Sequence, residues 1–424
     1  MKKIIILTVA MAGIALPAFA QSIVEIPDWD KKLTKDWGGA RQSLAEKGVV
    51  IEINSTHVSQ YVVDGGVETT LLGEKIDDDE HSLSTELDIK LDTDRLGLWP
   101  GGMFRIFTEF RTGQSVHNRA RAGTNFDSLF PAVPNHSGDD VIAVNELTLT
   151  QFLSETFGIF GGLIDSAFGD ENDFAGNGRS NDYFLNMNLN ANPVGMASTP
   201  DVTLGGGGIW IPNEIYQGWF GAFNSEATAG LNPFEHDEGT TFFAEGSRKH
   251  TIGGKGGKQT LGFMYGIDKD RADLFSDGRL ALESLLVNNT FPTTDKDTWA
   301  VYYNLQQYIK GDVEQGWGIF LRAGISDGDP NPVENFLSAG VGGKGIFASR
   351  PQDRFGIGAY WTKFSDDGLL AALDIDDSYG FEIFYNFEVI PGLNVTPDIQ
   401  IIESPLPRVD DTTVVAGIRT KWDF

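Results

Sequence analysis

Residues 83–92 read LSTELDIKLD, in which leucine, isoleucine or threonine alternates strictly with a polar or charged residue. This period of two predicts a β-strand with one apolar and one polar face, because successive side chains of a strand point to opposite sides. The same alternation returns in residues 104–111, 319–326 and 414–424. It begins after Gly48, and no linker interrupts it. The sequence therefore predicts an all-β architecture in a single unit.

The composition indicates a folded chain that does not bind nucleic acid. Of its 424 residues, 41% are apolar and 22% are charged, which is unlike the composition of a disordered chain. The formal net charge of -28 repels a polyanion. The chain contains no cysteine, so hydrogen bonding and packing must stabilise it without disulfides.

The N-terminus predicts export from the cytoplasm. Lys2 and Lys3 precede an apolar run, and an Ala-Phe-Ala site for cleavage ends at Ala20. We expect residues 1–20 to be a cleaved signal peptide instead of a membrane anchor of the same length. Beyond them no stretch of about 18 apolar residues occurs, which excludes transmembrane helices.

Two kinds of exported β-protein show this alternation, a soluble sandwich and a transmembrane barrel. Strands near ten residues long, the signal peptide and the aromatic Phe424 at the close of an amphipathic strand favour the barrel. Lipid offers the backbone no hydrogen-bond partner, so the sheet has to close on itself.

The expected organisation has two parts after the signal peptide. Residues 21–48 form an N-terminal periplasmic segment with a short helix over 38–47, where Gly48 ends the helix. Residues 49–424 form a transmembrane antiparallel β-barrel of about 16 strands, which is enough for an aqueous lumen.

No pattern for catalysis or cofactor binding is visible. The 6 histidines stand outside any recognisable motif, and neither G-x-S-x-G nor H-E-x-x-H occurs. The glycine run at residues 205–208 lacks the Gly-Lys-Ser/Thr of a phosphate-binding loop. We expect a protein that is not an enzyme and has no cofactor or metal site.

Several motifs resemble those of the carbohydrate-selective porins, the OprB-like family. The matching stretches are LTKDWGGAR at 33–41 with LAEKGV at 44–49, GIFGGLIDS at 158–166, RAG at 322–324, SDGDPNP at 326–332, GGKG at 342–345, RPQDRFG at 350–356 and VTPDIQ at 395–400. The resemblance implies a 16-stranded barrel in the outer membrane of a Gram-negative bacterium, through which sugars diffuse. Residues 205–300 match no part of this pattern, so selectivity is expected to differ there.

A sugar pore needs hydrogen-bonding side chains and aromatic faces on its inner wall. The alternation places the following pore-lining and sugar-contact candidates on the inner face: Arg105, Phe107, Glu109, Arg111, Glu146, Arg322, Glu382 and Arg419. Guanidinium groups can donate to two sugar hydroxyls, and carboxylates accept from them. The alternative is that these residues are ordinary wall residues that pair with one another. The loop that narrows the lumen cannot be read from the sequence.

The sequence therefore favours a passive outer-membrane porin for mono- or short oligosaccharides. We expect it to form a homotrimer in contact with outer-membrane lipid and lipopolysaccharide. The alternative is a general or cation-preferring diffusion porin without a sugar-binding site, since the chain is acidic. A soluble secreted protein that binds glycans is a third class, which would need no detergent for extraction.

Overall fold

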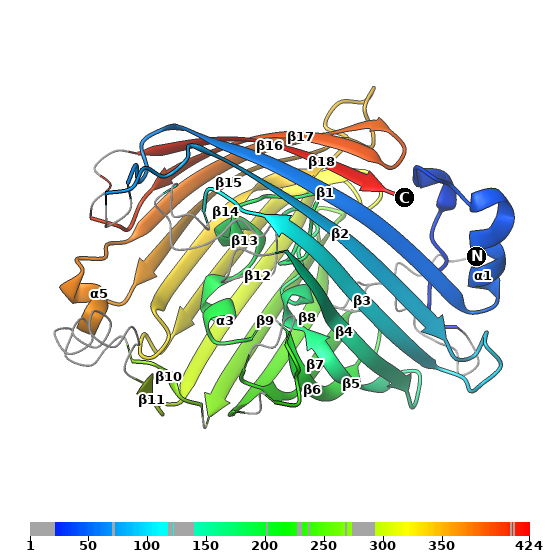
Figure 1. Ribbon diagram of the computed structural model, residues 1–424. Coiled ribbons are helices and arrows are strands. Elements are labelled where there is room, and N and C mark those ends of the chain that lie inside the picture. The colour runs from blue at the N-terminus through cyan, green and yellow to red at the C-terminus, as the bar shows by residue number, and fades with distance from the viewer. Residues whose placement is uncertain are drawn as a thin grey trace.

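The fold is a barrel of sixteen antiparallel strands that close on themselves (Figure 1). It is seen in a computed structural model that describes residues 22–69, 73–117, 122, 140–200, 202–226, 231–235, 238–267, 269–273, 293–407, 409 and 412–424. The expected signal peptide, residues 1–20, lies outside these ranges. The predicted fold class and strand number are confirmed.

Strands follow one another around the barrel in chain order, and the last pairs with the first. They are β1 (Val49–Asp64), β2 (Asp79–Asp92), β3 (Gly102–Gly113), β4 (Val141–Phe152), β5 (Phe157–Asp165), β6 (Val202–Trp210), β7 (Tyr216–Asn224), β8 (Thr240–Ile252), β9 (Lys255–Ile267), β12 (Thr298–Gly311), β13 (Gly316–Ser326), β14 (Val333–Lys344), β15 (Arg354–Phe364), β16 (Ser378–Ile390), β17 (Leu393–Glu403) and β18 (Thr413–Asp423).

The remaining elements are short. They are α1 (Ala40–Glu46), α2 (Met187–Asn190), α3 (Pro193–Ala197), α5 (Gly368–Ala372), the 3-10 turns η1 (Trp29–Lys31), η2 (Trp37–Gly39) and η3 (Ser166–Phe168), and the separate pair β10 (Arg271–Ala272) and β11 (Thr293–Thr294). The helix expected near the N-terminus is α1. None of the described helices is long and apolar enough to cross a membrane.

Strand β4 shows how the alternation sorts its side chains. Ile142 and Leu147 point outward and are 77% and 53% exposed, whereas the inward Thr148 and Thr150 are 4% and 0% exposed. The outward set forms an apolar band around the barrel, and the inward set lines or fills the lumen. A one-residue bulge opposite β3 places Glu146 on the inner face, where it is also buried.

The two ends of the barrel differ in their connections. The end near both labelled termini has short turns, such as residues 253–254 and 391–392 (Figure 1). The other end has longer connections, such as 365–377 and 166–201. Both termini therefore lie at the end of the barrel that has the short turns.

Arg41 of α1 ties the N-terminal segment to the seam where β1 pairs with β18. Its guanidinium donates to the Phe424 carbonyl oxygen at 2.8 Å and to the Ile51 carbonyl oxygen at 2.6 Å. The same group lies 4.1 Å from the ring centroid of Trp29 and 4.6 Å from that of Trp37. This contact fixes the end of β18 at the end of the barrel that has the short turns.

We expect Arg41→Ala to lower the free energy of unfolding by about 2 kcal/mol, because two partly buried carbonyls lose a charged donor and two indoles lose a cation. Urea unfolding of the refolded barrel, followed by tryptophan fluorescence, measures this change. Lys47→Ala removes the same charge from an exposed position at the end of the same helix and should be neutral. Equal effects of the two variants would contradict the role given to Arg41.

Candidate functional site

A long segment between β5 and β6 folds into the barrel. Residues 166–200, called the inward segment below, contain η3, α2 and α3, and Figure 1 shows α3 inside the ring of strands. α3 contacts β12, β13 and β14, and α2 contacts β14 and β15. The segment therefore narrows the lumen, as expected of an inward-folded loop whose path the sequence did not reveal.

The inward segment packs an apolar face against the wall formed by β12 to β16. Phe174, Phe184, Leu189 and Val194 are fully buried in this contact. The Phe184 ring lies 5.0 Å from that of Phe384, edge to face. The burial of four large apolar side chains stabilises the segment in the lumen by several kcal/mol, at about 1.5–3 kcal/mol for each.

Glycines on the wall make room for these side chains. A Cβ atom at Gly318 would lie 2.6 Å from Phe174 Cζ, and one at Gly356 would lie 2.8 Å from Phe184 Cζ. Neither distance is tolerated between carbon atoms, so the fit requires residues without a side chain.

Arg322 on β13 binds the inward segment to the barrel wall. Its guanidinium donates to the Asp170 carboxylate at 2.8 Å, to the Gly176 carbonyl oxygen at 2.6 Å and to the Leu189 carbonyl oxygen at 2.7 Å. The side chain is 0% exposed. The planar fork of arginine suits this task because it presents several donors in fixed directions.

Glu382 and Arg419 also hold this segment. The Glu382 carboxylate accepts from the backbone N–H groups of Leu185 at 2.6 Å and Asn186 at 2.8 Å. Arg419 donates to the Tyr183 carbonyl oxygen at 2.8 Å. The three predicted residues on β13, β16 and β18 thus bind backbone groups of the inward segment.

On the opposite wall the predicted residues form a network of ion pairs. Arg105 donates to Asp88 with two bonds of 3.0 Å and to Glu146 at 2.8 Å. Glu109 accepts from Arg179 of the inward segment at 3.0 Å. These ion pairs join β2, β3 and β4 to the inward segment. Side chains of both charge signs therefore face the lumen.

Phe107 and Arg111 complete the predicted set. The Phe107 ring lies 5.6 Å from that of Phe168 on the inward segment, edge to face. Arg111 Nε lies 3.6 Å from Glu109 Oε1. All eight predicted residues face inward and are at most 4% exposed. Direct contact with a sugar stays a prediction for each of them.

The partly exposed edge of the inward segment carries both signs of charge. Lys421 donates to the Asp182 carboxylate at 3.0 Å, and the Arg354 guanidinium lies 3.9 Å from the ring centroid of Tyr183. Burial alone would raise the pKa of Asp182, but the charges of Lys421 and Arg354 outweigh burial and keep that pKa below its ordinary value. This edge offers donors, acceptors and an aromatic face to a passing solute.

Asp170 makes the attachment of the inward segment sensitive to pH. Burial raises its pKa from 3.8 to about 6, and the charge of Glu245 adds to the rise while Arg322 opposes it. Because the folded state has the higher pKa, it takes up this proton first as the pH falls. As the pH falls from about 6 to about 4, Asp170 therefore makes a growing favourable contribution to the free energy of unfolding.

We expect the stability of the unmodified barrel to rise relative to Asp170→Asn as the pH falls through this window. Urea midpoints of both proteins from pH 7 to pH 4 measure the difference. Asp366→Asn removes the same charge from an exposed loop position and serves as the control for the substitution itself. A constant difference between the unmodified protein and Asp170→Asn would contradict the expectation.

Sequence reasoning missed the partners on the inward segment, namely Asp170, Arg179 and Asp182. It also missed the inner faces of β7 to β9, where Trp219 and Lys258 point inward beside the segment. These strands lie in residues 205–300, which matched no family motif. The alternation of Lys258, Thr260, Gly262 and Met264 with larger outward residues was the signal that could have found them.

Comparisons with known proteins, by sequence and by structure, all find porins. A model of the family described as carbohydrate-selective porin, OprB family, matches residues 78–424. Porin B of Pseudomonas aeruginosa is 24% identical over 98% of this chain and 96% of its own length. The high-pH structure of Pseudomonas putida OprB superposes with a TM-score of 0.76 at 21% identity, over 94% of this chain and 100% of that one. The low-pH structure gives a TM-score of 0.57 at 16% identity, with the same coverage.

Proposed function

This chain belongs to the carbohydrate-selective porins of the OprB family, and we propose that it lets mono- and short oligosaccharides cross by passive diffusion. The protein is a channel of the Gram-negative outer membrane and not an enzyme. What is proposed here is the mode of transport, the size of the sugar and the residues that it meets.

The observation that carries this proposal is the mixed lining of the narrowed lumen. Asp182 with Lys421 and Tyr183 with Arg354 present an acid, two bases and an aromatic ring at the partly exposed edge of the inward segment. Neutral hydroxyl groups can pair with donors and acceptors, whereas a ring of one charge sign would select ions. The network of Arg105 on the opposite wall has the same mixed character.

We assign two roles to the eight predicted residues. Arg322, Glu382 and Arg419 position the inward segment, because their hydrogen bonds go to its backbone. The remaining five line the opposite wall, where we propose that they keep the pore hydrated and contact sugars as these pass.

Single-channel conductance in a planar bilayer, titrated with glucose, maltose and a neutral polyol of similar size, tests the function. We expect concentration-dependent block by a sugar and no block by the polyol, together with sugar flux into proteoliposomes. Flux of sugar and polyol at equal rates without block would instead support a general or cation-preferring porin, which the formal charge of -28 favours.

We further propose that the protein is a homotrimer surrounded by outer-membrane lipid and lipopolysaccharide, after removal of residues 1–20. Support for the lipid contact comes from the outward apolar side chains, such as Ile142, Leu261 and Ile418 at 77%, 58% and 48% exposure. Large porins commonly form trimers. Native mass spectrometry of the extracted protein tests the subunit number and the mass of the mature N-terminus together.

A further inference from the structure

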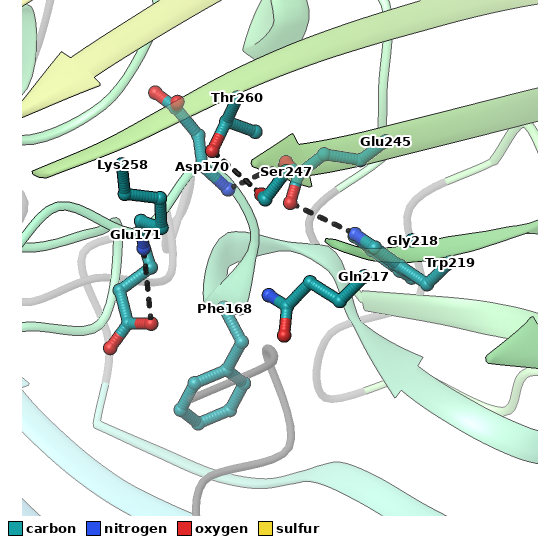
Figure 2. A pocket seen from close by; sticks show the side chains of 10 residues that line it. All are labelled: Phe168, Asp170, Glu171, Gln217, Gly218, Trp219, Glu245, Ser247, Lys258 and Thr260. Carbon is teal, nitrogen blue, oxygen red and sulfur yellow. Dashed lines mark hydrogen bonds and ion pairs between the residues drawn. The ribbon is translucent and has the colours of Figure 1, made fainter. Parts of the chain in front are cut away.

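A small niche lies between the inward segment and the inner faces of β7, β8 and β9 (Figure 2). Phe168 and Glu171 border it on the side of the segment, and Gln217, Trp219 and Lys258 border it on the side of the wall. The niche encloses about 10 Å³, which is room for one water-sized group. It can therefore hold a single hydroxyl group but not a whole sugar ring.

The aromatic side of the niche is held in place by the partly buried carboxylate of Glu245. Trp219 donates its indole N–H to Glu245 at 3.1 Å, and the other oxygen of Glu245 accepts from the Tyr302 hydroxyl at 2.6 Å and from the Asp170 backbone N–H at 3.2 Å. The Trp219 ring also lies 4.4 Å from that of Phe243. Its indole face is thus preorganised and loses little freedom when a ligand packs on it.

The polar side of the niche has hydrogen-bonding capacity left over. Lys258 is only 7% exposed, yet its ammonium lies 3.9 Å from the Glu171 carboxylate, which is too long for a hydrogen bond. The side-chain amide of Gln217 has no hydrogen-bond partner in the described part of the chain. Ser247 and Thr260 pair with each other at 2.7 Å and keep acceptor capacity. The Lys258 ammonium is not sealed from solvent, so a polar group that enters the niche can accept from it.

We infer that the niche binds one hydroxyl group of a neutral sugar as the sugar passes the inward segment. The hydroxyl oxygen accepts from Lys258 and Gln217, and the apolar face of the ring packs on Trp219. Besides Glu171 and Lys258, the carboxylates of Asp170 and Glu245 line the niche, so it disfavours acidic sugars. This inference rests on the proposed function and adds to it the residues that set selectivity.

The test compares glucose with each of its monodeoxy analogues as blockers of single-channel current. One analogue, which lacks the hydroxyl that enters the niche, should need about tenfold more sugar for half block of the unmodified channel, as expected for one hydrogen bond to a charged group. Lys258→Met should weaken block by glucose to the same level and make the two sugars equal. Lys344→Met removes the same charge from β14 and should preserve the tenfold difference.

The outcomes distinguish failure of the niche proposal from failure of the proposed transport function. If Lys258→Met leaves the difference between the sugars intact, the niche holds water only and the inference is wrong, although sugar block still upholds the proposed function. Sugar flux into proteoliposomes without any block of the unmodified channel also overturns the niche alone. Absence of sugar flux overturns both. Gln217→Leu provides a second variant, because its amide has no partner to lose. It should narrow the difference between the two sugars without removing it, because Lys258 still donates to the hydroxyl.

Discussion

Arg322→Ala is expected to raise single-channel conductance and to make it fluctuate, because the inward segment loses its strongest attachment to the wall. The substitution strands the Asp170 carboxylate and the carbonyl oxygens of Gly176 and Leu189, all of which accept from the guanidinium. Removal of one partner of a buried ion pair costs about 3–5 kcal/mol, since an uncompensated charge stays behind. Planar-bilayer recording and urea unfolding measure the two consequences.

Two further variants make this expectation specific. Arg248→Ala removes an exposed arginine from the outer face of β8 and should change neither conductance nor stability. The double variant Arg322→Ala with Asp170→Asn should recover part of the lost stability, because the stranded charge is gone. Unchanged conductance of a folded Arg322→Ala barrel would show that other contacts hold the segment without this arginine.

The alternation predicted the architecture because it is a local property of each strand. Residues such as Arg322 and Glu382 were assigned to the inner face from their position alone, and the structure places them there. Their attachment to the inward segment was not predictable, because it uses backbone groups. Arg322 bonds to a carbonyl 133 residues away and Glu382 to an N–H group 197 residues away. A backbone group has no side-chain identity, so no sequence pattern reports it.

The inward segment contains an alternating pattern that does not form a strand. In the run NMNLNANP at 186–193 asparagine occupies every second position, which resembles the period of a strand. These amides instead serve local backbone groups and the wall. Asn186 accepts from the Asn188 backbone N–H at the start of α2, and Asn192 donates to the Ala323 carbonyl oxygen at 3.0 Å. Short polar side chains compete with regular structure in this way, so periodicity alone does not distinguish the two cases.

The contact between the inward segment and the barrel wall also explains a glycine of the family-like motifs. RAG at 322–324 places Arg322 and Gly324 two residues apart, hence both on the inner face of β13. The arginine binds the inward segment, and the glycine leaves space for it. A Cβ atom at Gly324 would overlap Val194 Cγ2 and lie 2.6 Å from Asn192 Oδ1.

Gly324→Val is therefore expected to push α3 away from the wall and lower the free energy of unfolding by about 3 kcal/mol, at the upper end of the cost of overpacking. Conductance should rise as the segment loses its fit, and the substitution should also weaken the hydrogen bond from Asn192 to β13. Urea unfolding and planar-bilayer recording test both effects. Gly246→Ala is the matched control, because a Cβ atom there meets nothing within 4 Å on the outer face of β8. If Gly324→Val changes stability and conductance no more than this control does, close packing against Gly324 does not hold the inward segment. The ion pairs alone then fix its position.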